Sequence, residues 1–413
     1  MVYQIFPDRF CRLSLPDPTG LVGNRWVHEN WNDQPVWAPD PDGEVRNRDF
    51  FGGSLNGITA KLDDLAALGV TVLYLNPIFE SASNHRYNTA DYLRIDPMLG
   101  TEEDFRRLCR EAKQRGIRVI LDGVFNHTGS QSRYFNADGF YPGVGAAQST
   151  DSPYFNWFSF HPWPTDYDAW WGIMTLPAVQ ENEPDYRDFI IRGQDSVVRH
   201  WLRAGASGWR LDVADELPDD FIAEIRTAME ETAPDSFLLG EVWEDATTKY
   251  GFNQRRTYLL GKGLDSVMNY PFKNAVLDFV KGKPAEQAAN EILTICEHYP
   301  APAMDTALNF MSGWVAWGNY TACYPSNTDV KDYFIPVSRM FGWVGNSLVK
   351  TFWSKLDKPM NRRLIDTVLD TANIWLNGLV GMGYLLGARV EMLESENPLT
   401  NLMAGIIKLH VYM

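Results

Sequence analysis

The stretch that decides the fold is GWRLDVADE, residues 208–216. Its side chains alternate with a period of two, which predicts a strand that points Arg210 and Asp212 to the same side. An adjacent guanidinium is expected to keep the Asp212 carboxylate ionised and to lower its pKa, which is the state that a nucleophile requires. A purely structural Arg–Asp pair at the end of a strand explains the same pattern equally well.

Two similar runs lie on either side of this stretch. GIRVILDGVF (116–125) precedes it, and SFLLGEVW (236–243) follows it. Glu241 ends the apolar part of the later run, and Trp243 lies on the same side of the strand two residues later. Apolar surroundings of this kind predict a raised pKa for Glu241, as a general acid needs near neutral pH. A strand-end glutamate that caps the next helix is the alternative interpretation.

Farther out, the chain alternates between short β-rich runs and amphipathic helical patterns, which is typical of parallel strands joined by crossover helices. The expected strands cover 2–6, 70–76, 116–125, 207–213, 236–243 and 266–272, and the expected helices cover 58–68, 101–115, 185–203, 218–232 and 285–298. This alternation indicates the α/β class and favours a (β/α)8 barrel, also called a TIM barrel. The pattern weakens after residue 300, where we expect strands at 308–313 and 381–387 and a helix over 361–376.

Residues 127–184 interrupt the alternation. They are rich in Gly, Pro and aromatic residues, show no clear period and are far longer than an ordinary strand-to-helix connection, so we expect them to be functional. The expected domains are therefore a first barrel part over 1–126, an inserted domain, and a second barrel part over 185–413 whose residues 300–413 are atypical.

A barrel brings the carboxyl ends of its strands to one face, where catalytic residues collect. Asp212 and Glu241 lie near the carboxyl ends of neighbouring expected strands, so we expect the two carboxylates to converge there. Retaining glycosidases need two such groups about 5–5.5 Å apart, one to attack and one to protonate. LDGVFNHT (121–128) ends another strand at the same face, and its His127 is a candidate ligand of a sugar hydroxyl. A lone histidine at a strand end is more often structural.

Aromatic side chains also favour a carbohydrate ligand. They make up 13% of the chain and include 15 Trp, and the flat C–H faces of sugars lie well on such rings, although core packing accounts for most of them. The loop SNHRYNTADY (83–92) follows the second expected strand and offers His85 and Tyr87. Tyr87 is a candidate for stacking on a sugar, although a loop aromatic more often packs on its own domain.

The bulk properties exclude several other classes of protein. A formal net charge of −16 excludes the basic surface that binds nucleic acid. Cysteines at 11, 109, 296 and 323 lack C-x-x-C spacing, which indicates neither a disulfide framework nor a zinc site and favours the cytoplasm. The N-terminus does not read as a signal peptide, and the longest apolar stretch falls short of the about 20 residues of a membrane span, so we expect no membrane partner. The sequence does not decide between a monomer and a homodimer.

The motifs now resemble a known family. DGVFNH (122–127), GWRLDVADE and GEVW (240–243) resemble, in order and spacing, the first three conserved regions of the α-amylase family, glycoside hydrolase family 13. YQIFPDRF (3–10) and MTLPAVQENEPD (174–185) look like its neopullulanase, cyclomaltodextrinase and maltogenic-amylase branch. The resemblance implies a retaining hydrolase or transglycosylase acting on α-1,4-glucans such as maltooligosaccharides, cyclodextrins or pullulan.

The resemblance also implies residue roles. Asp212 would be the nucleophile, Arg210 its partner and Glu241 the general acid/base. The inserted residues 127–184 would form the domain B that shapes the cleft. The residues that it implies at the substrate are His127, Tyr87, His85, Asp122, Asn126, Asp215, Glu216 and Trp243, with Asn126 also fastening the insertion and Asp215 and Glu216 on the acceptor side.

One departure from the family concerns turnover. The fourth region normally carries a His–Asp pair whose Asp stabilises the transition state, but LNFMSGWVAW (308–317) has Trp314 and Val315 where that pair would fall. Transition-state contacts of this kind are worth several kcal/mol. The alternative function is therefore a catalytically impaired, carbohydrate-binding homologue. A scaffolding barrel is a third reading, but it gives no reason for Asp212, Glu241 and His127 to occur together.

A second departure concerns the calcium ligands and the accessory β-sandwich domains of the family. Relatives often carry an Asn/Asp-rich loop and FGGD that supply calcium ligands, whereas this chain has CRLSLPD (11–17) and FGGS ending in Ser54. We expect no calcium there, no other metal and no required cofactor. We also expect neither the N-terminal nor the C-terminal β-sandwich that the branch usually adds.

Overall fold

The protein is described from a computed structural model of its chain. The structure describes residues 1–413 except 42, 44, 262, 301–302, 304–343, 346, 353–360, 382–384, 386, 404–405 and 413. The chain divides into two compact units, Met1–Ala316 and Trp317–Met413.

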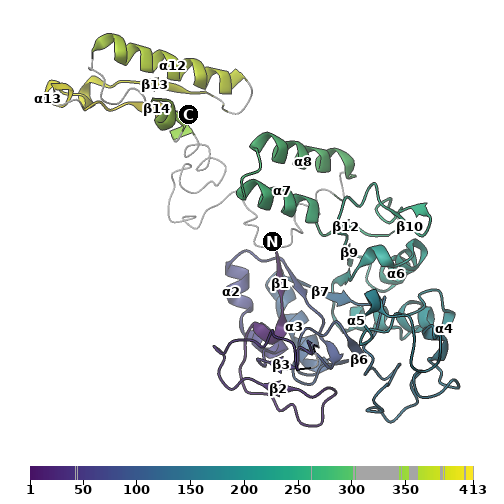
Figure 1. The fold of residues 1–413 in the computed structure, drawn as a ribbon. Coiled ribbons are helices and arrows are strands. Elements are labelled where there is room, and N and C mark those ends of the chain that lie inside the picture. Colours follow the sequence, from purple (N-terminus) through teal and green to yellow (C-terminus); the bar gives the residue numbers. More distant parts are fainter. Residues whose placement is uncertain are drawn as a thin grey trace. The chain divides into compact units, whose positions relative to one another are not determined.

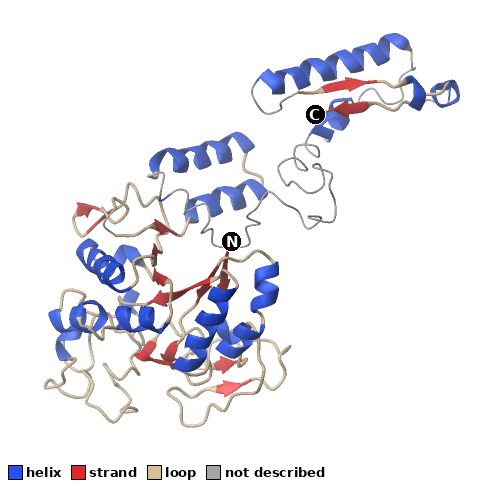
Figure 2. Ribbon diagram, turned by 180° about the vertical axis from the view of Figure 1, so that it is seen from behind, coloured by secondary structure: helices blue, strands red, loops and turns tan. Residues whose placement is uncertain are grey.

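A parallel sheet is the centre of the first unit (Figures 1 and 2). Its strand order is β1-β4-β7-β8-β9-β12, so neighbouring strands follow one another along the chain, as in the wall of a barrel. All five strand pairs are parallel. The strands are β1 (Val2–Ile5), β4 (Val72–Leu75), β7 (Arg118–Gly123), β8 (Gly208–Leu211), β9 (Phe237–Gly240) and β12 (Ser266–Val267).

Helices connect these strands and cover the sheet. They are α1 (Leu55–Ala60), α2 (Leu62–Ala67), α3 (Glu102–Gln114), α4 (Pro184–Arg187), α5 (Val197–Ala204), α6 (Asp219–Thr232), α7 (Tyr270–Val280) and α8 (Ala285–His298). The α3 helix begins where the Thr101 side chain accepts from the Asp104 N–H and Asp104 accepts in return, which satisfies two end donors. Its apolar face, including Phe105 and Leu108, is fully buried, and α3 packs on β7.

The register places three strand ends level with one another. Asp122 on β7 lies opposite Arg210 on β8, and Leu211 lies opposite Gly240 on β9. The residues of β8 are all buried, as expected for a strand covered on both faces. The residues that follow β8 and β9 therefore emerge side by side at the carboxyl edge of the sheet.

Residues 127–184 are held together by aromatic rings more than by regular elements. Their only described helical turns are 3-10 turns at Phe155–Trp157 and Trp170–Gly172. Tyr134 and Trp157 pack with ring centroids 5.3 Å apart, and Trp157 also contacts Tyr186 on α4 at 5.1 Å. A bridge between His127 and Ala178 joins the start and the end of the segment.

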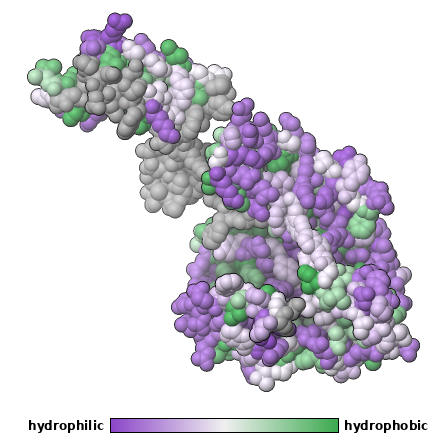
Figure 3. Space-filling view, in the orientation of Figure 1, coloured by the Kyte–Doolittle hydropathy of each residue, from purple (hydrophilic) through white to green (hydrophobic). Residues whose placement is uncertain are grey.

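Shorter elements decorate this unit. They are Pro7–Arg9, β2 (Trp26–Val27), β3 (Asp49–Phe50), β5 (Phe79–Ser81), β6 (Thr89–Ile95), Asp188–Arg192, Ala214–Glu216, β10 (Tyr250–Gly251) and β11 (Gln254–Arg255). The β5 and β6 strands form an antiparallel hairpin that packs against α5. Hydrophilic side chains predominate on the face of this unit that Figure 3 shows. No helix among the described residues is both long and apolar enough to cross a membrane.

The α/β class and the six parallel strands are confirmed, but several element boundaries are wrong. The single helix expected over 185–203 is broken at Gly193, whose extended backbone separates a π-helical turn from α5. The run 266–272 is a strand only to Val267, because Asn269 accepts from the Phe272 N–H and begins α7, a helix that the sequence analysis missed. The loop expected over 83–92 lies partly in the β5–β6 hairpin.

The second unit contains a helix and a two-stranded sheet. The helix expected over 361–376 is confirmed as α12 (Arg362–Gly381), and β13 (Arg389–Glu391) pairs antiparallel with β14 (His410–Tyr412). Glu394–Glu396 and α13 (Leu399–Met403) are further described elements of this unit. The strand expected at 308–313 and most of that at 381–387 lie outside the described residues, and the expected division into barrel parts and insertion stays a prediction.

Candidate active site

Three carboxylates share one buried guanidinium at the carboxyl edge of the sheet. Arg210 donates through Nη1 to Asp122 Oδ1 and Asp212 Oδ1, both at 2.7 Å, and its Nη2 lies 2.6 Å from Glu241 Oε2. Asp122 lies on β7, Asp212 directly follows β8 and Glu241 directly follows β9. The predicted pairing of Arg210 with Asp212 is therefore present, and Asp212 and Glu241 are separated by little more than one guanidinium.

The backbone explains why these two carboxylates converge. The ladder continues past the strand ends, since the Asp212 N–H donates to Gly123 O and the Glu241 N–H donates to Leu211 O, both at 3.0 Å. The chain then turns sharply at Val213, a β-branched residue in the left-handed region with φ +42°. This turn aims the Val213 N–H at Glu241 Oε2, at 3.1 Å.

Tyrosines on one side of the cluster orient Asp122. Its Oδ2 accepts from the hydroxyls of Tyr74 at 2.6 Å and Tyr87 at 2.9 Å. Asn76 donates to the Tyr87 hydroxyl at 3.0 Å and accepts from Gln4 at 2.9 Å. Tyr87 is predicted from the sequence as a candidate for stacking on a sugar, and in the structure its hydroxyl is bonded to Asp122. Tyr74 and Asn76 are not among the predicted site residues, although their period-two spacing in VTVLYLN points both to one side of β4.

A different set of donors reaches Glu241. The Tyr270 hydroxyl at the start of α7 donates to Glu241 Oε1 at 2.8 Å, and the Trp243 indole also donates to this carboxylate. The sequence pattern predicts a strand at Tyr270, which is not among the predicted site residues. Glu241 therefore accepts from Val213, Trp243 and Tyr270 besides Arg210.

The structure reverses both pKa shifts expected from the sequence. Burial raises the pKa of Asp212 to about 7, with Asp122 and Glu241 adding to the effect and Arg210 opposing it. Burial also acts to raise the pKa of Glu241, but Arg210 and the three hydrogen bonds outweigh it, so this pKa is lowered. The reason is the sharing of Arg210, since Nη2 serves Glu241 alone while Nη1 is divided between two aspartates. Burial raises the pKa of Asp122 as well, against Arg210.

His127 and Asn126 present buried polar atoms without partners. Burial lowers the pKa of His127 to about 4, so its ring is neutral, and its Nε2 donates to Tyr87 O at 3.1 Å. Nδ1 is then an acceptor, and it has no hydrogen-bond partner among the described residues. The Asn126 side-chain amide also lacks a partner there, whereas its backbone oxygen accepts from the Val179 N–H at 3.1 Å, near the far end of residues 127–184. Unpaired buried atoms of this kind are rare and suit a polar ligand.

His85 lies beside this group. Its ring stacks on Tyr87 with centroids 5.9 Å apart, and its Nδ1 accepts from the Tyr87 N–H at 3.1 Å. Burial and the neighbouring Arg86 lower the pKa of His85 to about 4. His85 thus supports the backbone of Tyr87 as a neutral ring.

The remaining predicted site residues, Asp215 and Glu216, already have partners within the chain. Asp215 is already engaged, because Tyr258 donates to it at 2.8 Å and Lys249 pairs with it at 3.0 Å. Glu216 accepts from the indole N–H groups of Trp170 at 2.8 Å and Trp171 at 2.9 Å. Neither tryptophan is among the predicted site residues, because their only sequence signal is the run WWG inside a segment without periodicity.

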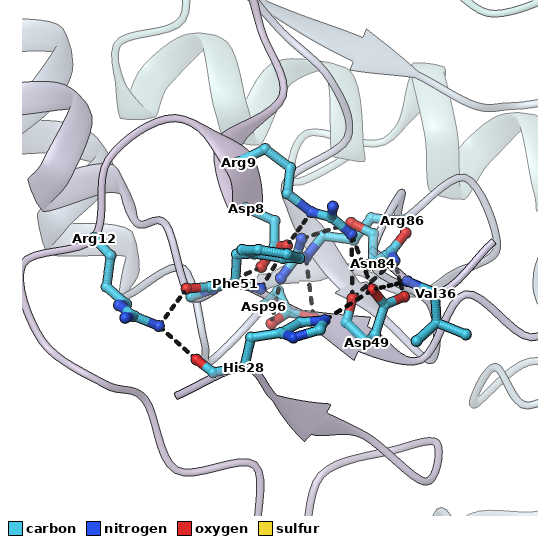
Figure 4. A network of polar contacts seen from close by, with 11 residues as sticks. Asp8, Arg9, Arg12, His28, Val36, Asp49, Phe51, Asn84, Arg86 and Asp96 are labelled. Atoms are coloured by element: carbon cyan, nitrogen blue, oxygen red, sulfur yellow. Dashed lines mark hydrogen bonds and ion pairs between the residues drawn. The ribbon is translucent and has the colours of Figure 1, made fainter. Parts of the chain in front are cut away.

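The residues that a family-type calcium site would need do not fit a cation here (Figure 4). The Ser54 hydroxyl accepts from the Gly57 N–H at 3.1 Å and caps α1. Asp8 accepts from the backbone N–H groups of Phe51 and Gly52 at 2.9 and 3.1 Å. Backbone oxygens nearby accept from the guanidinium of Arg12, and no group of three or more metal-ligating side chains occurs in the described part of the chain.

Known proteins resemble this chain over the part that contains the candidate active site. The family model of the α-amylase catalytic domain matches residues 4–329. An amylopullulanase of Thermoanaerobacterium saccharolyticum is 38% identical over 352 residues, covering 75% of this chain and 27% of the relative. Neopullulanase 2 of Thermoactinomyces vulgaris is 37% identical over 289 residues, covering 68% of this chain and 43% of the relative.

A solved structure agrees. The cyclic α-maltosyl-(1→6)-maltose hydrolase of Arthrobacter globiformis, in complex with maltose, is 35% identical with a TM-score of 0.60, covering 73% of this chain and 62% of that one. The chain spans between 18% and 52% of the length of the curated relatives that it matches.

Proposed function

The chain belongs to the α-amylase family, and we propose that it is a retaining glycoside hydrolase or transglycosylase of α-1,4-glucans. The observation that carries this proposal is the convergence of Asp212 and Glu241 on the two ends of one buried guanidinium. Two carboxyl groups at about 5–5.5 Å are what retention by double displacement needs, and a shared guanidinium holds them on that scale. The names of the relatives support glucans such as pullulan and cyclodextrins as substrates.

In the proposed reaction, Glu241 protonates the glycosidic oxygen while Asp212 Oδ attacks the anomeric carbon. The bond to the leaving sugar breaks, and a covalent glycosyl ester of Asp212 forms. Water or a sugar hydroxyl then attacks the anomeric carbon, gives its proton to Glu241 and releases Asp212. Arg210 holds both groups in place, and the unpaired Nδ1 of His127 and the amide of Asn126 are positioned to bond sugar hydroxyls.

This chemistry needs one proton shared between the two carboxylates. Because the pKa of Asp212 is raised to about 7 and that of Glu241 is lowered, the pair holds one proton over the intervening pH range. In the ligand-free protein that proton favours Asp212, whereas the reactive form carries it on Glu241. Only the fraction of the singly protonated enzyme that carries the proton on Glu241 is then reactive. The pH range of activity is still the range over which Asp212 and Glu241 together hold one proton.

A trapping experiment tests the proposal. A 5-fluoroglycosyl fluoride should leave a covalent adduct on the peptide that contains Asp212, detected by mass spectrometry, because the fluorine slows breakdown of the ester. The parent protein should also release reducing sugar from maltoheptaose with retained anomeric configuration, and Glu241→Gln should not. Adduct on another residue, or equal rates for the two proteins, would remove the assignment.

A second candidate is a carbohydrate-binding homologue with impaired catalysis. It is favoured by the absence of a His–Asp dipeptide anywhere in the sequence, and Trp314 and Val315 lie outside the described residues. Calorimetric binding of maltoheptaose without product over a long incubation would select it over the enzyme.

We also propose a cytoplasmic location, which the free thiols of Cys11, Cys109 and Cys296 support. Cell fractionation tests it, and recovery of the protein outside the cytoplasm would refute it.

A further inference from the structure

An exposed corner of two indole rings lies next to the proposed acid. Trp171 is 65% exposed and Trp243 is 37% exposed, and their rings meet edge to face with centroids 5.6 Å apart at 86°. Trp243 follows Glu241 by two residues and donates to its carboxylate. Large exposed aromatic surface beside a reactive group suits a ligand that covers it.

The Trp171 ring is held in place although it is exposed. Its indole N–H and that of Trp170 both donate to the carboxylate of Glu216, which follows β8 in the chain. Trp170 stacks against Trp171 with centroids 5.1 Å apart and an interplanar angle of 16°. A ring fixed by a charged acceptor and a stacked neighbour binds a ligand with little loss of its own freedom.

The backbone of Trp171 is also strained. Its φ of +52° and ψ of +27° lie in the left-handed region, which is unfavourable for a bulky side chain. Strain of this kind persists only where the surroundings impose it, and it concentrates at functional sites. In this chain the turn at Gly172, also at positive φ, presents the ring outward.

We propose that Trp171, held by Glu216, is a stacking platform for glucose residues of the leaving group. This proposal rests on the proposed function, because Trp243 bonds the acid that would protonate the leaving oxygen. The C–H faces of glucose pack on indole faces, and two perpendicular rings suit a chain that bends, as an α-glucan does. The part of the substrate on the far side of the broken bond would face Asn126 and His127 instead.

Two substrates separate the platform from the chemistry. α-Maltosyl fluoride has fluoride as its leaving group and cannot reach the platform, whereas maltoheptaose has a leaving sugar chain that can. Trp171→Ala is expected to lower the ratio of kcat/KM for maltoheptaose to kcat/KM for α-maltosyl fluoride by about 3- to 10-fold. The matched control is Trp37→Ala, which removes another highly exposed indole outside the site and should keep the parent ratio.

The role of Glu216 has its own readout. Glu216→Gln offers one acceptor oxygen where the carboxylate offers two, so it should also lower the ratio of kcat/KM for maltoheptaose to kcat/KM for α-maltosyl fluoride. Because Glu216 acts through Trp171, the ratio of the double variant Trp171→Ala/Glu216→Gln should be no lower than that of Trp171→Ala alone. An unchanged ratio in Trp171→Ala, or additive effects, would overturn the proposal. If the parent protein does not turn over α-maltosyl fluoride at all, the proposed function is refuted instead.

The platform remains testable even in a protein without turnover. Calorimetry of maltoheptaose with Glu241→Gln would then show weaker binding when Trp171→Ala is added, and unchanged binding would refute the platform.

A separate observation concerns the loop after β1. Arg12 donates through Nη1 to His28 O at 2.7 Å and Phe51 O at 3.1 Å, and through Nη2 to Glu29 O at 2.8 Å. Its guanidinium also lies 5.6 Å from the ring of Trp31. Three backbone oxygens from two segments therefore converge on one positive group, as they would on a cation. Figure 4 shows the bonds of Arg12 to His28 and Phe51.

We infer that Arg12 takes the place of a structural divalent cation in this loop, so that folding is independent of calcium. The apparent Tm of the parent protein should be the same in EDTA and in millimolar calcium chloride. Arg12→Met should lower Tm by about 4–8 °C through loss of three charge-assisted hydrogen bonds, and calcium should not restore it. The control is Arg110→Met, which removes an exposed arginine of α3.

A fall in the Tm of the parent protein in EDTA would overturn this inference. A Tm of Arg12→Met equal to that of the Arg110→Met control would do the same.

Discussion

Two buried ion clusters in the first unit differ in their charge balance. Asp96 is fully buried and is met by two guanidinium groups, Arg25 at 2.9 Å and Arg86 at 3.3 Å (Figure 4 shows Asp96 and Arg86). Burial acts to raise the pKa of Asp96, but the two arginines outweigh it, and this pKa is lowered. At the sheet edge the ratio is inverted, since one guanidinium serves three carboxylates and the pKa of Asp212 is raised to about 7.

The comparison separates a group that holds the fold from a group that can react. Asp96, which is paired with two arginines, stays ionised and is locked in place, whereas Asp212, which shares Nη1 of Arg210 with Asp122, retains a proton near neutral pH. Perturbed protonation of the second kind concentrates at functional sites. The ratio of arginines to carboxylates in a buried cluster therefore decides whether a carboxyl group is ionised or protonated near neutral pH.

The largest expected effect comes from breaking the under-neutralised cluster. Asp212→Asn removes the proposed nucleophile and should lower kcat/KM on maltoheptaose by about 10⁴-fold or more. It also removes one of the three like charges around Arg210, so the apparent Tm should be unchanged or higher. Activity assays and thermal unfolding of the same preparation check both parts, and a marked fall in Tm would contradict them.

The reverse outcome is expected for the balanced cluster. Asp96→Asn leaves the buried Arg25 and Arg86 without a counter-charge and should lower the free energy of unfolding by about 3–5 kcal/mol. Denaturant titration measures this loss. Asp63→Asn, which removes an exposed carboxylate paired with Arg115, is the control and should leave the free energy of unfolding unchanged. Equal stability of the two variants would show that the balance around Asp96 does not matter.

The pH profile of activity sharpens the comparison without a mutation. As pH rises through about 7, the pair of Asp212 and Glu241 loses its last proton and no acid remains, so kcat/KM should fall. On the acid side, kcat/KM should fall only at pH values below the ordinary pKa of a glutamate, because the pKa of Glu241 is lowered. A profile that keeps rising above pH 8 would be inconsistent with this sharing.

The smallest expected effect concerns one hydrogen bond. Tyr270→Phe removes the donor at Glu241 Oε1, which weakens the stabilisation of the ionised carboxylate and raises the pKa of Glu241. The acid limb of the profile should move to higher pH, with less than about a tenfold change in kcat/KM at the optimum. Tyr258→Phe, which removes a donor to Asp215, is the control and should leave the acid limb in place.

Local patterns predicted the strands and the convergence of the site. The period of two in 208–216 places Arg210 beside Asp212, and consecutive parallel strands bring Glu241 and Asp122 to the same edge. The pKa directions were predicted wrongly, because they depend on how many carboxylates share Arg210, and that number is a property of the packed sheet. Residue roles and domain boundaries stay predictions.

Other parts of the site had no readable signal. Trp170 and Trp171 lie in a segment held by ring contacts, where no periodicity indicates which side chain is exposed. Tyr270 was read as part of a strand because its apolar neighbours extend past Val267, while the cap at Asn269 turns the chain into α7. The break at Gly193 was missed because the residues on both sides of it have a helical pattern.

The bridge between His127 and Ala178 has a consequence for engineering. Since the chain leaves the sheet edge and returns to it at one point, the residues between form a closed excursion whose length does not set the spacing of β7 and α4. A transplanted segment with the same two ends would replace the rings of Trp170 and Trp171, while Asp212 and Glu241 would stay at the ends of β8 and β9. Substrate range and bond-breaking chemistry would then be two separately adjustable parts of one chain.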